Sequence, residues 1–162
     1  MRWNIVLRYI GLILLLDAVF MLLAACVSLL DGVDTGFYPL LQSFLLTSIL
    51  GAFPLIFVSK GGSVNSQEGY AVVTGAWLMS CLAGMLPYVL WGGEFSFVNA
   101  WFESVSGFST TGSTILGDVE ALPKGMLFWR ASTHWLGGMG VVMFVLVVLP
   151  SMGSTKMRLS SV

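Results

Sequence analysis

The chain has 162 residues, of which 57% are hydrophobic and 9% are charged, and its formal net charge is −1. A soluble domain carries roughly 25% charged residues, so a chain of this composition has too little polar surface to cover its apolar side chains in water. The near-zero net charge argues against nucleic acid as a partner, because no basic surface is available for phosphates. The composition therefore predicts an integral membrane protein whose surroundings are the lipid bilayer.

Three apolar segments, at 5–30, 37–58 and 70–91, meet the length of about 20 residues that a helix needs to cross a bilayer. A fourth segment, at 122–149, is mixed at its start and wholly apolar from Val141 onward. We therefore expect an all-α membrane protein with four crossings.

The basic residues predict the orientation of these crossings. Lys124 and Arg130 lie toward one side of the membrane, whereas the remaining five fall on the other side: Arg2, Arg8, Lys60, Lys156 and Arg158. Loops on the cytoplasmic side carry an excess of Lys and Arg. Both termini are therefore expected in the cytoplasm.

A shorter and more polar stretch, 95–116, separates the third and fourth apolar segments. Its apolar residues recur at i, i+3, i+4 and i+7 from Val98 onward, and Ser96 can cap the helix that this spacing predicts. A helix over 97–107 would be about 16 Å long, half the thickness of the hydrocarbon core. We expect this half-helix to enter the membrane without crossing it.

A polar run with a central glycine follows the half-helix. Non-helical backbone at membrane depth is tolerated only where it is buried in protein or lines water. Extended backbone can offer its carbonyl oxygens to a dehydrated cation, and Gly112 permits the positive φ that turns a carbonyl toward a pore. Such runs also form ordinary surface loops, but the place between a half-helix and a spanning helix favours a pore loop. The candidate ion site is the filter backbone of Thr110, Thr111, Gly112, Ser113 and Thr114.

Several charged and small residues near this run are candidates for structural or functional roles. Glu103 is ionisable inside a membrane segment, where charge is costly and commonly functional; it either braces the filter by accepting N–H groups or lies solvated in the outer vestibule. Arg130 is expected to extend to the outer interface. Three glycines of the fourth segment form either a gating hinge or a close-packing surface: Gly137, Gly138 and Gly140.

The sequence FESVSGFSTTGST at 102–114 resembles the first pore loop of the Trk/Ktr/HKT superfamily of potassium transporters, most closely its bacterial TrkH branch. The sequences LPKG at 122–125 and WLGGMG at 135–140 resemble the helix after that loop. The resemblance implies potassium transport across the bacterial inner membrane, with K⁺ held through Thr111 and Gly112.

The resemblance also implies the domain organisation. A leading transmembrane helix pair is expected at 1–62, followed at 63–162 by one membrane–pore-loop–membrane unit with its pore helix at 97–107 and its filter at 110–114. Superfamily members carry four such units around one pore, whereas this chain has one. The expected partners are therefore further repeats of a longer polypeptide or copies of this chain. A cytoplasmic nucleotide-binding regulatory subunit is implied as well, and no cofactor other than the transported K⁺.

Two other classes of function are considered. A non-conducting membrane interaction subunit, or a truncated fragment of a transporter, fits a chain with a single pore unit. An intramembrane enzyme acting through Glu103 or His134 is disfavoured, because the chain has one histidine, no paired carboxylates and no nucleophile motif. We expect that the chain is not an enzyme.

Overall fold

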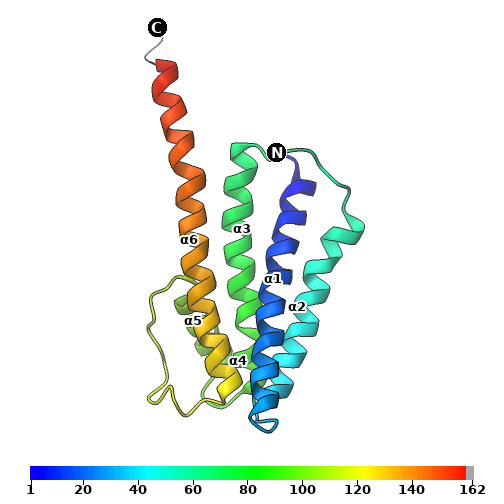
Figure 1. Cartoon of the computed structure of the whole chain (residues 1–162), viewed down its shortest axis with the longest axis vertical. Helices are drawn as coiled ribbons and strands as arrows, with labels where there is room; N and C mark the ends of the chain where they lie inside the picture. Colours follow the sequence, from blue (N-terminus) through cyan, green and yellow to red (C-terminus); the bar gives the residue numbers. More distant parts are fainter. Residues whose placement is uncertain (160–162) are drawn as a thin grey trace.

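A computed structural model of the protein describes residues 1–159, and the side chains of residues 1–143, 145 and 146. Most of the described chain is helical, and no strand occurs between residues 1 and 159. Figure 1 shows four long helices side by side, with two short helices gathered at the end of the bundle opposite the N-terminus. The predicted cytoplasmic C-terminus and the last residues of the unit 63–162 lie outside the described residues.

The predicted leading helix pair consists of α1 (Trp3–Leu30) and α2 (Phe37–Phe57). The two helices approach closely where two glycines meet, because a Cβ added to Gly11 would lie 2.6 Å from the carbonyl oxygen of Gly51. Small residues at such crossings are typical of membrane helices, which gain most of their contact energy from close packing. α2 continues for about one turn after Pro54, whose carbonyl oxygen accepts from the N–H of Val58 at 3.1 Å; the proline removes only the bond that its own N–H would make to the preceding turn.

The third crossing is divided into α3 (Ser66–Gly84) and α4 (Leu86–Trp91). It begins before residue 70 because Asn65 and Glu68 form a capping box, in which each side chain accepts from the other's backbone N–H. The division follows from Pro87 in the first turn of α4, a position that tolerates proline because its N–H would be unpaired anyway.

Three helical stretches of the described chain are long and apolar enough to cross a membrane: Trp3–Leu30, Phe37–Phe57 and Ser66–Trp91. Their outer faces carry large apolar side chains, such as Ile56 and Phe57, which are 73% and 71% exposed. Faces of this kind must be covered by lipid or by another protein surface. α6 (Lys124–Leu159) has 36 residues and is about 54 Å long at 1.5 Å per residue; its crossing of the membrane stays a prediction.

The predicted half-helix is α5 (Phe97–Phe108), which packs against α3, α4 and α6. Its 12 residues extend about 18 Å. The hydroxyl oxygen of Ser96 accepts a hydrogen bond from the N–H of Asn99 at 3.3 Å, as expected of its N-cap. The chain between α5 and α6 then lies beside the lower half of α6 and returns to the end opposite the N-terminus (Figure 1). The predicted all-α membrane fold is therefore confirmed, with a leading helix pair and a half-helix before the last helix; the role of the segment after α5 as a pore loop stays a prediction.

The core of the bundle lies where the short helices meet the long ones. Tyr88, Met126 and Trp129 are each 0% exposed. The indole N–H of Trp129 donates to the carbonyl oxygen of Gly84 at 3.1 Å, at the end of α3. This contact satisfies a carbonyl that the break before α4 frees from the helix, so that α6 is fixed against the third crossing.

Candidate functional site

α5 ends in a turn that also begins the candidate filter. The N–H of Thr111 donates to the carbonyl oxygen of Ser106 and the N–H of Thr110 to that of Gly107, both at 3.0 Å. This pair of bonds is a Schellman motif, whose turning residue adopts the left-handed conformation and is usually glycine. Here Thr110 takes that position with φ of 58°. A β-branched residue in this region is strained, so surrounding contacts must hold the turn.

The backbone after the turn leaves carbonyl groups without protein partners. Gly112 has φ of 77°, the positive value that the sequence predicts. Within the described residues, no hydrogen bond ends on the carbonyl oxygens of Thr110, Thr111 or Gly112. The carbonyl oxygen of Ser113 accepts from the Ser106 hydroxyl at 2.6 Å, which leaves one of its two lone pairs available. The run 110–113 is exposed, so these oxygens can meet water or an ion.

Glu103 ties the end of this run to α5 and α6. Its carboxylate accepts from the Thr114 hydroxyl at 2.8 and 3.0 Å and from the N–H of Ile115 at 3.3 Å. Arg130 of α6 donates to the same carboxylate through Nε at 2.9 Å. The side chain of Glu103 is 1% exposed and that of Arg130 is 18% exposed. A buried carboxylate is stable in this place only because each oxygen receives charged or polar donors.

The expectation for Arg130 is therefore wrong. Its side chain turns inward to Glu103 instead of extending to the outer interface, because the buried carboxylate offers a stronger partner than water at the membrane surface. His134, one turn further along α6, pairs through Nδ1 with the carbonyl oxygen of Arg130 at 2.8 Å. A Cβ added to Gly112 would lie 3.8 Å from Nε2 of His134, so the imidazole lies next to Gly112.

Glycines allow α5 and α6 to approach each other behind the turn. A Cβ on Gly137 would overlap the carbonyl oxygen of Phe108, and one on Gly107 would overlap the hydroxyl of Thr133. Gly138 lies beside Thr110, whose Cγ2 would be 3.8 Å from an added Cβ, and Gly140 has nothing within 4 Å. The close-packing reading thus describes Gly137, whereas nothing in the described residues packs on Gly140.

The sequence places Ser106 on the same polar face of the half-helix as Glu103 but does not reveal its role, which is to join the two ends of the run. Its hydroxyl donates to Ser113 and its carbonyl oxygen accepts from Thr111 and, at 3.4 Å, from Gly112. The available signal is its spacing, because Ser106 is one helical turn after Glu103 and therefore lies on the same face of α5. Among the described residues no group of three or more His, Cys, Asp or Glu side chains could hold a metal ion.

Residues 39–162 match the family model TrkH, described as cation transport protein. The chain is 33% identical over 162 residues to the Trk system potassium uptake protein TrkH of Vibrio parahaemolyticus, in an alignment that covers 98% of this chain and 33% of that protein. It is 30% identical over 164 residues to TrkH of Escherichia coli K12, with the same coverage of 98% and 33%. The crystal structure of the potassium transporter TrkH from Vibrio parahaemolyticus superposes with a TM-score of 0.84 at 32% identity.

That superposition covers 93% of this chain and 32% of the transporter. The chain thus spans about a third of the length of the relatives that it matches. The family match extends over most of the chain and includes α5, the run 110–114 and α6. The chain belongs to the TrkH family of cation transport proteins.

Proposed function

We propose that the chain supplies one of the four selectivity-filter strands of a Trk-type potassium uptake system in the bacterial inner membrane. In this proposal 1–62 is the peripheral helix pair, 63–162 is the pore-forming unit, and both termini are cytoplasmic. The relatives named as potassium uptake proteins support the choice of ion. The distribution of Lys and Arg supports the orientation.

The observation that carries the proposal is the set of unpartnered carbonyl oxygens that follows the half-helix. K⁺ would be held by the carbonyls of Thr111 and Gly112, with Thr110, Ser113 and Thr114 flanking them. Carbonyl oxygens can replace the water shell of a potassium ion. The C-terminal end of α5 adds roughly half a negative elementary charge near the same point, which favours a cation over an anion.

Glu103 would brace this strand from behind. Its bonds to Thr114 and Ile115 hold the end of the run, and its ion pair with Arg130 connects the run to α6. The strand is otherwise fixed by Ser106. A filter needs such support, because its carbonyls must keep their positions when the ion leaves.

One strand cannot surround an ion, so the conducting assembly would contain further pore repeats of a longer polypeptide or copies of this chain. A cytoplasmic nucleotide-binding subunit would regulate it. The second candidate function is a membrane interaction subunit that conducts nothing, which the coverage of about a third of the relatives' length leaves open. The two functions differ in whether substitutions in the run 110–114 alter ion flux.

The test is Gly112→Asp in the assembly that takes up K⁺. An added Cβ has no neighbour closer than 3.8 Å, so the substitution does not force the helices apart. The side chain instead disfavours the positive φ that aims the carbonyl. We expect K⁺ uptake to fall at least about tenfold, or the preference for K⁺ over Na⁺ to be lost.

Gly117→Asp is the matched control, since Gly117 lies in the same loop with nothing within 4 Å and without a positive φ. It should insert and take up K⁺ like the unmodified protein. Unchanged uptake and ion preference in Gly112→Asp would end the filter assignment and favour the interaction subunit.

A further inference from the structure

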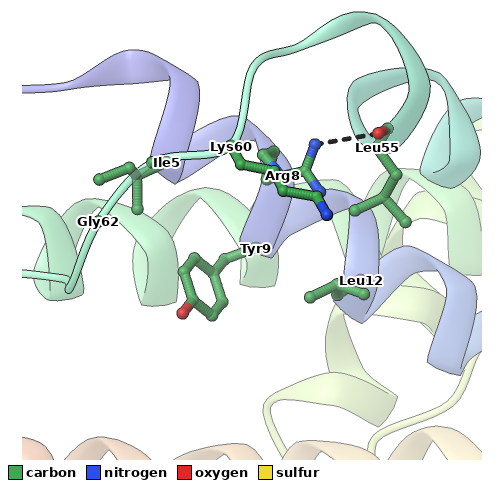
Figure 2. A pocket seen from close by; sticks show the side chains of 8 residues that line it. Ile5, Arg8, Tyr9, Leu12, Leu55, Lys60 and Gly62 are labelled. Atoms are coloured by element: carbon green, nitrogen blue, oxygen red, sulfur yellow. Dashed lines mark hydrogen bonds between the residues drawn. The ribbon is translucent and has the colours of Figure 1, made fainter.

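A groove of about 300 Å³ lies between the first turns of α1 and the segment that joins α2 to α3 (Figure 2). It opens at the end of the bundle that carries the N-terminus, far from α5 and the candidate filter (Figure 1). Arg8 and Lys60 supply two positive charges, and Tyr9, Leu12 and Leu55 supply apolar and aromatic surface. We refer to these five residues as the basic groove.

Contacts within the protein fix the walls of the groove. A Cβ on Gly61 would overlap the side chain of Ile5, so that this part of the connecting segment lies directly on α1. Asn4 donates to the hydroxyl of Ser59 at 3.1 Å, and Arg2 donates to the carbonyl oxygen of Ser63 at 2.7 Å. The groove is therefore a preformed feature and needs no loop rearrangement to accept a ligand.

Much of the hydrogen-bonding capacity of the two basic side chains is unused. Nη1 of Arg8 donates to the carbonyl oxygens of Leu55 and Val58, at 3.0 and 2.7 Å, and so caps the end of α2. A guanidinium has five N–H groups, so three remain on Nε and Nη2. Lys60 forms no ion pair within the described residues. Glu68, the acidic residue of the first turn of α3, is already paired with Arg2 at 2.8 Å. The local charge is therefore positive and uncompensated.

Below the two charges, α1 carries an exposed apolar strip. Leu12 and Leu16 follow Arg8 at intervals of one helical turn and are 49% and 48% exposed, and Tyr9 beside them is 43% exposed. Arginine, lysine and tyrosine at the membrane interface above such a strip match the two ends of a phospholipid. A free anion would gain nothing from the apolar strip.

We propose that the basic groove binds an anionic phospholipid, with its phosphodiester at Arg8 and Lys60 and an acyl chain along Leu12 and Leu16. Basic pockets between membrane helices commonly hold anionic headgroups. The occupant is a lipid because the groove joins two positive charges to an exposed apolar strip of α1. The proposal concerns the helix pair alone and does not depend on the role of the filter.

The test measures the affinity of the purified 162-residue chain, in nanodiscs or detergent, for phosphatidylglycerol and for zwitterionic phosphatidylcholine. Each basic residue near the headgroup contributes about a fivefold change in affinity, so Lys60→Gln should weaken phosphatidylglycerol binding about fivefold and Arg8→Gln with Lys60→Gln about 25-fold. Lys124→Gln is the control, because it removes one charge at the opposite end of the bundle (Figure 1) and should change nothing.

Further binding measurements distinguish a lipid from other possible occupants of the groove. Leu12→Asn should weaken the binding of phosphatidylglycerol without changing that of inorganic phosphate. Replacing Arg8 could also disturb the end of α2, which Arg8 caps. Lys60→Gln is therefore the deciding variant, and an unchanged affinity for phosphatidylglycerol in it would overturn the proposal. Equal affinity for phosphatidylcholine would overturn it too. Displacement of the lipid by excess inorganic phosphate, with Leu12→Asn neutral, would assign the groove to a free anion instead.

Discussion

Glu103 and Arg130 form an ion pair at the back of the candidate filter, where both side chains are largely withdrawn from water. Taking two charges out of water is costly, and a well-packed apolar pair in the same place is often as stable. The pair is therefore better explained by positioning than by stability. The carboxylate also receives the Thr114 hydroxyl and the N–H of Ile115, which an apolar side chain could not do.

Replacing Glu103 by Gln should destabilise the protein by about 3–5 kcal/mol, because the mostly buried guanidinium of Arg130 would lose its counter-charge. Thermal unfolding in detergent measures this loss, and K⁺ uptake by the conducting assembly should fall with it. The control is Lys124→Gln, which breaks the ion pair between Lys124 and Asp31, whose side chains are 67% and 37% exposed. That change should cost less than about 1 kcal/mol.

The double variant Glu103→Gln with Arg130→Gln distinguishes pairing from simple loss of packing. If the two residues act as a pair, the double variant should lose clearly less stability than the sum of the two single variants. Additive losses would mean that neither residue depends on the other, and the positioning argument for Glu103 would fail.

At the scale of elements, the position of the candidate filter depends on how α5 meets α6. The carbonyl oxygen of Phe108, in the last residue of α5, lies against Gly137 and also accepts from the indole N–H of Trp77 at 3.1 Å. Ser104 donates to the carbonyl oxygen of Cys81 at 2.7 Å. α5 is thus held on one side by α3 and on the other by α6, and the turn at Thr110 begins from a fixed point.

Gly137→Ala should therefore destabilise the contact between α5 and α6 by about 1–3 kcal/mol, since the new methyl group overlaps backbone and not a movable side chain. Gly140→Ala is the matched control three residues along the same helix, where a Cβ meets nothing within 4 Å. Alanine is the better helix former, so this variant should be neutral or more stable by up to about 1 kcal/mol. Thermal unfolding of both variants is the measurement. Equal behaviour of the two would show that α5 and α6 do not meet at Gly137.

For the whole molecule, the sequence predicts the helices well because their pattern is local. The first three apolar segments give the three helical stretches long enough to cross a membrane. Ser96 and the spacing after it give α5 to within one residue at its end, and the need for positive φ identifies Gly112. The membrane setting also predicts that Asp17 pairs with a neighbouring helix. It accepts from the Ser80 hydroxyl of α3 at 2.5 Å.

Other features of the candidate site depend on tertiary contacts, which the local sequence pattern does not reveal. Arg130 has two acceptable environments, the interface and a buried carboxylate, and the choice depends on how near α6 comes to Glu103. The left-handed turn at Thr110 contradicts the intrinsic preference of a β-branched residue, so the preferences of the individual residues do not predict it. The role of Ser106 likewise exists only after the chain has turned back toward α5.

The proposed single pore unit leads to a prediction for the isolated 162-residue chain, which should insert into membranes but conduct no K⁺ as a monomer. One run of carbonyl oxygens cannot replace the water shell of an ion from all sides. The missing strands should also affect the rate at which backbone N–H groups of this run exchange with solvent. Within the described residues the N–H groups of Ser113 and Thr114 donate no hydrogen bond, whereas that of Ala100 donates to Ser96 at 2.8 Å. Ser113 and Thr114 should therefore exchange fast in the isolated chain, with α5 as the protected internal reference, and slow down when the other strands complete the pore. Flux in liposomes and exchange in detergent are measured on the same preparation. K⁺-selective flux from a proven monomer would contradict the need for further strands, and strong protection of Ser113 and Thr114 in that monomer would show that the run is ordered without them.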